Sequence, residues 1–76
     1  MNATLVEIIK RNFGPYEGDL DPSWGPDQLP AWDSMSHLNM VMDLQMELDI
    51  QLEFEEVMAI MTVGDILEAA KKHGVS

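Results

Sequence analysis

The sequence has no cysteine and very few basic residues. Without cysteine, neither a disulfide framework nor a thiolate metal site can form. Lysine and arginine number four against fourteen acidic residues, which gives a net charge of −10, and no basic residue stands between Asn12 and Ala70. Such a charge repels nucleic acid and anionic membranes and attracts basic protein surfaces. We therefore expect protein partners, and neither nucleic acid nor membrane.

Long apolar runs are also missing. No stretch approaches the roughly 18 apolar residues that a membrane-spanning helix needs. The segment 1–4 has neither the basic region nor the apolar run of a signal peptide, so the expected location is the cytoplasm.

The chain is too short for a deep pocket. Its 76 residues predict a single domain, 1–76, and 46% hydrophobic residues are typical of a folded one. A domain of this size has one modest core, whereas ligand pockets need roughly 300 Å³ or more of concave volume. We therefore expect a protein that is not an enzyme.

Helical spacing of apolar residues accounts for the rest of the chain, and no strand pattern is present. The segment 4–7 fits a capping box with Thr4 as the N-cap, and the first helix then runs to Gly14. A second helix opens at 33–34 and continues to about Leu48. One or two turns follow in 53–58, and a last helix begins near Thr62. The prediction is all-α: a small bundle of three main helices plus one short helix, with a long loop between the first and second helices.

The predicted loop 14–33 contains all four prolines and both tryptophans. A loop of this length in a compact domain is usually functional or packed by its own side chains. We expect Trp24, Leu29 and Trp32 to anchor it to the core.

Acidic residues at alternate positions of this loop raise the question of a calcium site. A calcium loop of the EF-hand type that started at Asp19 would need glycine at position 24 and glutamate at position 30. Trp24 and Pro30 stand there instead. The cluster of Asp19, Asp21 and Asp27 is therefore interpreted as part of an acidic turn, and no metal site is predicted.

Asp33, Ser34 and His37 lie close together in the sequence, as the members of a hydrolase triad might. However, the Gly-x-Ser-x-Gly pattern and a preceding strand are missing. A triad also needs an oxyanion hole and a substrate pocket, which a chain of this size hardly provides. His37 is therefore predicted to be an ordinary exposed or half-buried helix residue. Ser34 lies where the long loop meets a helix N-terminus, which favours a phosphate ester.

At these residues the sequence resembles the acyl carrier protein family. That family carries an Asp-Ser-Leu or Asp-Ser-Met motif, which stands here as 33–35. The resemblance runs without a gap to about Lys72 and includes the segments 41–44, 47–52 and 62–65. Motif, size, acidity and helix layout together carry it.

The resemblance implies a mechanism and a set of partners. A phosphopantetheinyl transferase would attach 4'-phosphopantetheine to the Ser34 hydroxyl, and the arm would carry acyl groups as thioesters. The carrier would meet an acyl- or aminoacyl-loading ligase and downstream acyl-transfer enzymes, and we expect it to be a monomer. Its partner-recognition surface would comprise Asp33, Met35, Asn39, Met42, Asp43 and Glu47.

The resemblance also suggests a slot for the acyl chain beside the second helix. Candidate lining residues are Leu38, Met42, Leu44, Met58, Ile60 and Met61, although core packing explains most of them as well. Neutral Asn39, Gln45 and Met46 stand where fatty-acid carriers often have glutamate, and Trp32 replaces a small residue. These departures favour a specialised carrier, in a secondary pathway or with a dedicated ligase.

Two questions stay open from the sequence. The cargo could be a fatty acyl group, an aminoacyl group or another small acid. The first alternative function is an acidic helical protein–protein interaction module in which Ser34 is never modified. The second is a small calcium-binding helical protein.

Overall fold

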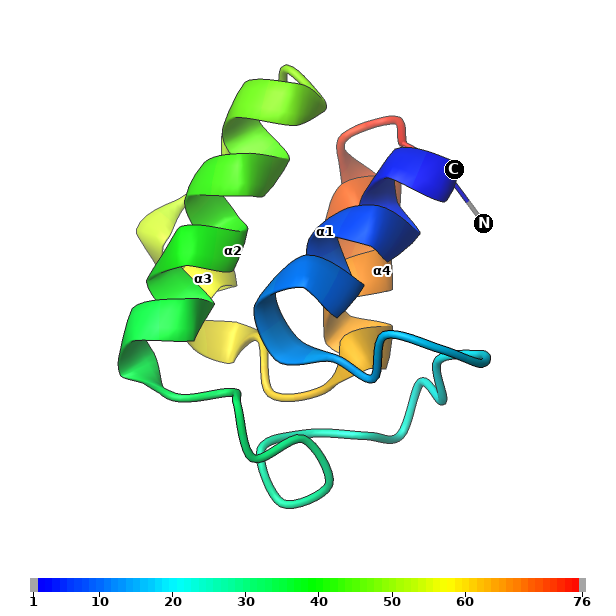
Figure 1. Cartoon of the computed structure of the whole chain (residues 1–76). Coiled ribbons are helices and arrows are strands. Elements are labelled where there is room, and N and C mark those ends of the chain that lie inside the picture. Colours follow the sequence, from blue (N-terminus) through cyan, green and yellow to red (C-terminus); the bar gives the residue numbers. More distant parts are fainter. Residues whose placement is uncertain (1, 76) are drawn as a thin grey trace.

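Four helices make up the regular structure of the chain. The computed structural model describes residues 2–75 and contains α1 (Ala3–Phe13), α2 (Ser34–Glu47), α3 (Phe54–Ala59) and α4 (Val63–Lys72), with no strand in that range. Helices α1 and α4 lie on one side of the molecule and α2 on the other, with the short α3 next to α2 (Figure 1). The predicted all-α class, with three longer helices, one short helix and a long first connection, is confirmed.

Helix α1 begins earlier than the sequence predicted. The side chain of Asn2 is the N-cap, and its Oδ1 accepts hydrogen bonds from the amides of Thr4 (2.8 Å) and Leu5 (3.1 Å). The predicted capping box with Thr4 as N-cap is therefore wrong. Asparagine is the stronger N-cap residue, and with Asn2 in this role Thr4 falls inside the first turn. At the other end the helix stops as predicted at Gly14, whose φ of 71° favours glycine.

The other helix starts agree with the sequence. Asp33 caps α2, and Thr62 caps α4 in a capping box with Asp65. Helix α3 starts after Glu53, whose amide donates to the carboxylate of Glu56 (3.0 Å). Local side-chain chemistry thus fixes where three of the helices begin.

The core is built from one face of α1, α2 and α4 together with residues of the connecting segments. Helix α3 contributes no buried residue. The largest fully buried side chains are Leu5, Ile8, Ile9, Met40, Leu44, Val63 and Ile66. Because these come from the three longer helices, α3 lies against the bundle without being part of its core.

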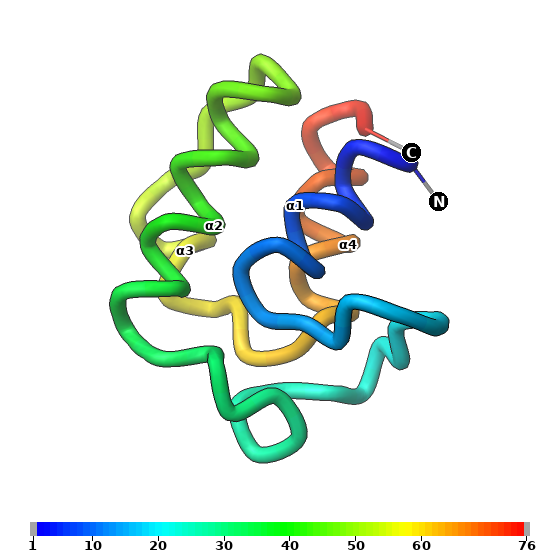
Figure 2. The backbone as a smooth tube through the Cα atoms, viewed as in Figure 1, coloured from blue at the N-terminus to red at the C-terminus, as the bar shows by residue number. Residues whose placement is uncertain are grey.

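The long loop is bound to the start of α4. Val63 donates its amide to the Trp24 carbonyl, and Gly64 donates to Pro22, both at 2.8 Å. These bonds satisfy two amides that a helix N-terminus leaves free. At Gly25 the two segments come so close that a Cβ would lie 2.6 Å from the Met61 carbonyl oxygen. Figure 2 shows the loop passing beneath the helices toward α2.

The predicted anchors of this loop are confirmed. Leu29 and Trp32 are buried, and Trp24 packs half-buried against the core. Trp32 stacks on Phe13 of α1, with ring centroids 4.2 Å apart and an angle of 15° between the ring planes. The loop therefore holds its last residues, which lead directly into α2, in a fixed position.

Candidate functional site at the start of helix α2

Ser34 is the first residue of α2, and its side chain is exposed. The preceding Asp33 accepts a hydrogen bond from the Ser36 amide at 2.8 Å. Hydrogen bonds from the backbone and side chain of Ser36 lower the pKa of the Asp33 carboxyl below its usual value. Asp33 therefore stays ionised near neutral pH and fixes the first turn of α2, which presents Ser34 to solvent.

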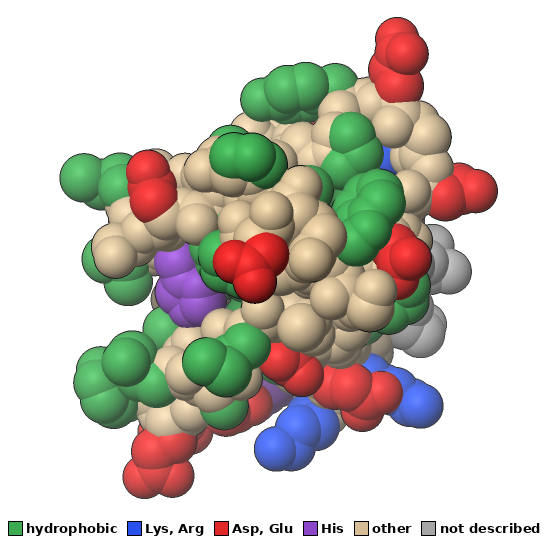
Figure 3. All heavy atoms as spheres, turned by 90° about the horizontal axis from the view of Figure 1, so that it is seen from below, with side chains coloured by type: hydrophobic (Ala, Val, Ile, Leu, Met, Phe, Trp, Pro, Cys, Tyr) green, Lys and Arg blue, Asp and Glu red, His purple; other side chains and the backbone are tan. Residues whose placement is uncertain are grey.

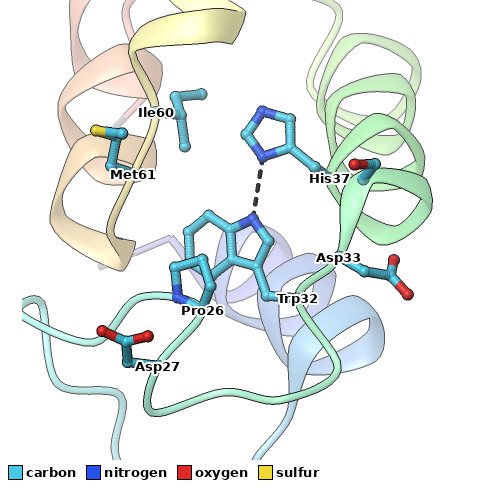
Figure 4. A pocket seen from close by; sticks show the side chains of 8 residues that line it. Pro26, Asp27, Trp32, Asp33, His37, Ile60 and Met61 are labelled. Carbon is cyan, nitrogen blue, oxygen red and sulfur yellow. Dashed lines mark hydrogen bonds between the residues drawn. The ribbon is translucent and has the colours of Figure 1, made fainter.

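His37, one turn further along α2, uses both ring nitrogens within the protein. Its Nδ1 lies 3.0 Å from the indole Nε1 of Trp32, and its Nε2 lies 2.9 Å from the Val57 carbonyl oxygen. Indole N–H can only donate, so Nδ1 must accept and Nε2 must donate. Figure 4 shows the imidazole pointing at the indole, away from the start of the helix.

This arrangement excludes the hydrolase triad. A general base needs a ring nitrogen free to take the serine proton, and neither nitrogen of His37 is free. Asp33 is bound to Ser36 instead of orienting the imidazole. The half-buried position predicted for His37 is confirmed. Its bond to Trp32 was missed, because a contact from a loop to a helix leaves no periodic signal in the sequence.

Two hollows open on either side of Ser34. The larger, of about 550 Å³, lies between the long loop and the connection from α3 to α4, and Figure 4 shows it at close range. The smaller, of about 280 Å³, lies between α2 and α3. Ser34 and His37 line both. The other lining residues are Pro26, Asp27, Trp32, Asp33, Ile60 and Met61 in the larger hollow, and Leu38, Val57 and Met58 in the smaller.

Comparison with solved structures identifies this architecture. A protein of Mycobacterium tuberculosis described as an acyl carrier protein is 22% identical, with a TM-score of 0.78 and 90% of each chain covered. A holo acyl carrier protein from Geobacter metallireducens is 25% identical, also with a TM-score of 0.78, over 95% of this chain and 86% of the other. The chain has the fold of the acyl carrier proteins. No model of a known protein family matches the sequence, and no curated protein sequence matches it either.

The carrier fold places the predicted slot residues in three different surroundings. Leu38 and Met58 line the hollow between α2 and α3, as predicted. Ile60 and Met61 line the larger hollow on the other side of Ser34. The remaining two, Met42 and Leu44, line neither hollow, because each lies roughly two to three turns along α2 from Ser34. Leu44 is instead fully buried in the core, and Met42 is exposed.

Four of the predicted partner-recognition residues lie free on the surface of the carrier fold. Asp33, Met35, Asn39 and Met42 are all exposed. Met35 is 68% exposed, and Met42 is 56% exposed. Figure 3 shows hydrophobic and acidic side chains interspersed over one face of the molecule, with a histidine among them. Their role in partner binding stays a prediction.

The other two, Asp43 and Glu47, are engaged with α1. Arg11 lies 2.6 Å from Glu47 Oε2 and 3.4 Å from Asp43 Oδ2. Asn12 also donates to Asp43 at 3.0 Å. The hydrogen bonds that Arg11 donates to Glu47 and then to Glu7, together with the charges of Glu47 and Asp43, raise the pKa of the Arg11 guanidinium above its usual range. The sequence offered no way to see this cluster, since it depends on how α1 and α2 pack.

The acidic loop residues do not gather. Asp21 accepts hydrogen bonds from the amide (2.9 Å) and hydroxyl (2.8 Å) of Ser23, and these lower the pKa of its carboxyl. In residues 2–75, no three side chains of the metal-binding types form a group that could hold an ion. Over the same residues, no helix has the length and apolarity that crossing a membrane requires.

Proposed function

We propose that this protein is a carrier that tethers acyl or aminoacyl intermediates as thioesters on a 4'-phosphopantetheine arm attached to Ser34, and presents them to partner enzymes. The observation that carries the proposal is the position of Ser34. It is an exposed serine at the first position of α2, next to two hollows, in a chain with the acyl carrier fold.

The surroundings of Ser34 fit such an arm. A phosphodiester on its hydroxyl would lie at the N-terminus of a helix of 14 residues, where the helix dipole favours negative charge. The apolar residues Met61 and Leu38 lie on opposite sides, one in each hollow, and offer surface for the rest of the arm. When bound, the arm supplies a thiol that carries the acyl group as a thioester.

The attachment step balances as a phosphoryl transfer. The Ser34 oxygen forms a bond to the pantetheine-side phosphorus of coenzyme A, and the pyrophosphate P–O bond breaks, with 3',5'-ADP as the leaving group. The hydroxyl proton passes to a base of the transferase or to water. This chain contributes the exposed hydroxyl and the rigid first turn, whose Asp33 cap is ionised. It needs no catalytic residue of its own for this step.

The proposed partners are the transferase, a loading ligase and downstream acyl-transfer enzymes. Exposed Met35 and Met42 on α2 support apolar contact with them, because Asp43 and Glu47 are already paired with Arg11. Charge at the edge of an interface mainly affects the association rate. We therefore expect the methionines to contribute more to the affinity of a partner than these two carboxylates.

The test is to incubate the protein with coenzyme A and a broad-specificity phosphopantetheinyl transferase and to weigh the intact product. We expect one added phosphopantetheinyl group in the wild type and in Ser36→Ala, and none in Ser34→Ala. Labelling of Ser34→Ala would refute the site. A folded wild type that gains no mass would refute the carrier function and favour an acidic helical interaction module.

A further inference from the structure

Helix α3 is held against α2 by a hydrogen bond from His37. The helix is six residues long and buries none of them. Val57 packs half-buried against the core, and its carbonyl oxygen lies 2.9 Å from His37 Nε2. This bond joins α2 to α3 inside the smaller hollow, beside Ser34. At this point the imidazole bonds α2 to α3 directly, in addition to the packing of Val57 against the core.

Behind this imidazole the protein is filled with aromatic rings. The indole of Trp32 donates to His37 Nδ1 and is only 7% exposed. Trp32 in turn stacks on Phe13, which is buried in the core. A chain that entered from Ser34 between α2 and α3 would meet His37, then Trp32, then Phe13. Phe13 and Trp32 are both buried and stacked on each other, so that neither ring can move aside without disturbing the other.

We propose that His37 is a clasp that closes the space between α2 and α3, so that this carrier holds short acyl groups at its surface and does not bury long ones. This inference rests on the proposed function of Ser34. A short acyl group needs only the hollow of about 280 Å³ with its apolar residues Leu38 and Met58. A long chain must separate α3 from α2 and leave the His37 Nε2–H without its acceptor, which costs free energy.

The side chain at position 37 must make two hydrogen bonds, one as acceptor and one as donor. Glutamine offers one acceptor and one donor and can replace both bonds, whereas leucine can replace neither. His37→Gln therefore serves as the matched control for His37→Leu, since both keep a side chain of similar reach on the same helix face. Trp32→Phe removes the indole donor and part of the buried ring but keeps an aromatic ring against Phe13, so it should open the clasp partially.

The main experiment loads the arm from butyryl-, octanoyl- and dodecanoyl-coenzyme A and measures the rate at which hydroxylamine cleaves each thioester. In the wild type and in His37→Gln we expect similar rates for all three chains. In His37→Leu the dodecanoyl thioester should be cleaved at least about fivefold more slowly than the butyryl one, because buried methylenes stabilise the sheltered state. Wild-type protection of the dodecanoyl thioester equal to that of His37→Leu would overturn the proposal.

A second measurement needs no arm. Amide hydrogen exchange of the unmodified protein should speed up in residues 54–59 of His37→Leu, with α1 and α4 unchanged and His37→Gln like the wild type. Unchanged exchange in 54–59 would overturn the clasp, and so would His37→Gln behaving like His37→Leu. Failure of the proposed function would give a different result. The protein would gain no mass from coenzyme A, while residues 54–59 of His37→Leu would still exchange faster.

Discussion

Ser34 lies between two neighbours of opposite character, the irregular loop 14–33 on one side and the regular helix α3 on the other. The loop has no helix or strand of its own, yet it buries Leu29 and Trp32 and binds the start of α4 through backbone hydrogen bonds. Helix α3 has regular backbone bonds but no fully buried residue, and its Val57 is half-buried against the core. Regular secondary structure and firm attachment are therefore separate properties, and attachment follows buried apolar area and tertiary hydrogen bonds.

The two sides of Ser34 would contribute differently to the proposed carrier function. A group attached to Ser34 would start from a fixed point, because buried Trp32 anchors the chain two residues before it. A group carried there would also have to be released, and α3, which has no fully buried residue, would be the easier side of the site to move. His37 limits the movement of α3, because it bonds both to Trp32 of the firmly anchored loop and to Val57 of α3.

The largest expected effect comes from breaking the firm side. Trp32→Ala removes a buried indole that stacks on Phe13, and such losses cost about 3–5 kcal/mol of stability. Tyr16→Ala is the control, since Tyr16 belongs to the same loop and is 77% exposed, and it should change stability by less than about 0.5 kcal/mol. Urea unfolding followed by circular dichroism measures both. Equal losses would show that the loop is not an anchor.

A smaller loss is expected where the loop crosses the connection to α4. Gly25→Ala places a methyl group 2.6 Å from the Met61 carbonyl oxygen, and the crowding should cost about 1–3 kcal/mol. Urea unfolding again measures the loss. The substitution leaves the hydrogen bond from the residue 25 amide to Gln28 in place, so the loss reports the crowding alone. A stability equal to that of the wild type would mean that the loop at Gly25 and the connection at Met61 separate easily. The loop would then be attached no more firmly than α3.

The smallest effect is expected on the loose side, at Glu56 of α3. Hydrogen bonds from the Glu53 amide and then from His73 lower the pKa of the Glu56 carboxyl below its usual value. A lowered pKa adds stability above the unfolded-state pKa of about 4.3, and this stability is lost as the pH falls through the folded-state pKa. Melting temperatures of the wild type and Glu56→Gln should therefore differ slightly at neutral pH and converge in acid.

Glu55→Gln is the matched control for this titration, because it removes the same charge from an exposed neighbour in the same helix. It should not reproduce the convergence. A gap between the wild type and Glu56→Gln that widens in acid would contradict the assignment of the lowered pKa to the folded state. A large effect at neutral pH would mean that α3 is held more firmly than its lack of buried residues indicates.

Local signals in the sequence are enough to predict the helices and to place Ser34 at the start of one of them. Apolar spacing, the caps Asp33 and Thr62, and the stop at Gly14 are local signals, and each acts through backbone geometry within one turn. The exception, Asn2 in place of Thr4, is a choice between two caps two residues apart, which the sequence alone did not resolve. The motif at 33–35 likewise needed only its own residues and their place before a helix.

The surroundings of Ser34, in contrast, are built from contacts between distant parts of the chain, which no local signal predicts. The Trp32–His37–Val57 chain joins a loop and two helices, and the pairing of Arg11 with Glu47 joins residues 36 apart in the sequence. Such contacts depend on the angle and distance at which helices and loops pack, and the helical spacing of apolar residues specifies neither of these. For the same reason the sequence suggested Leu44 as a slot residue, whereas in the folded protein its side chain is buried in the core.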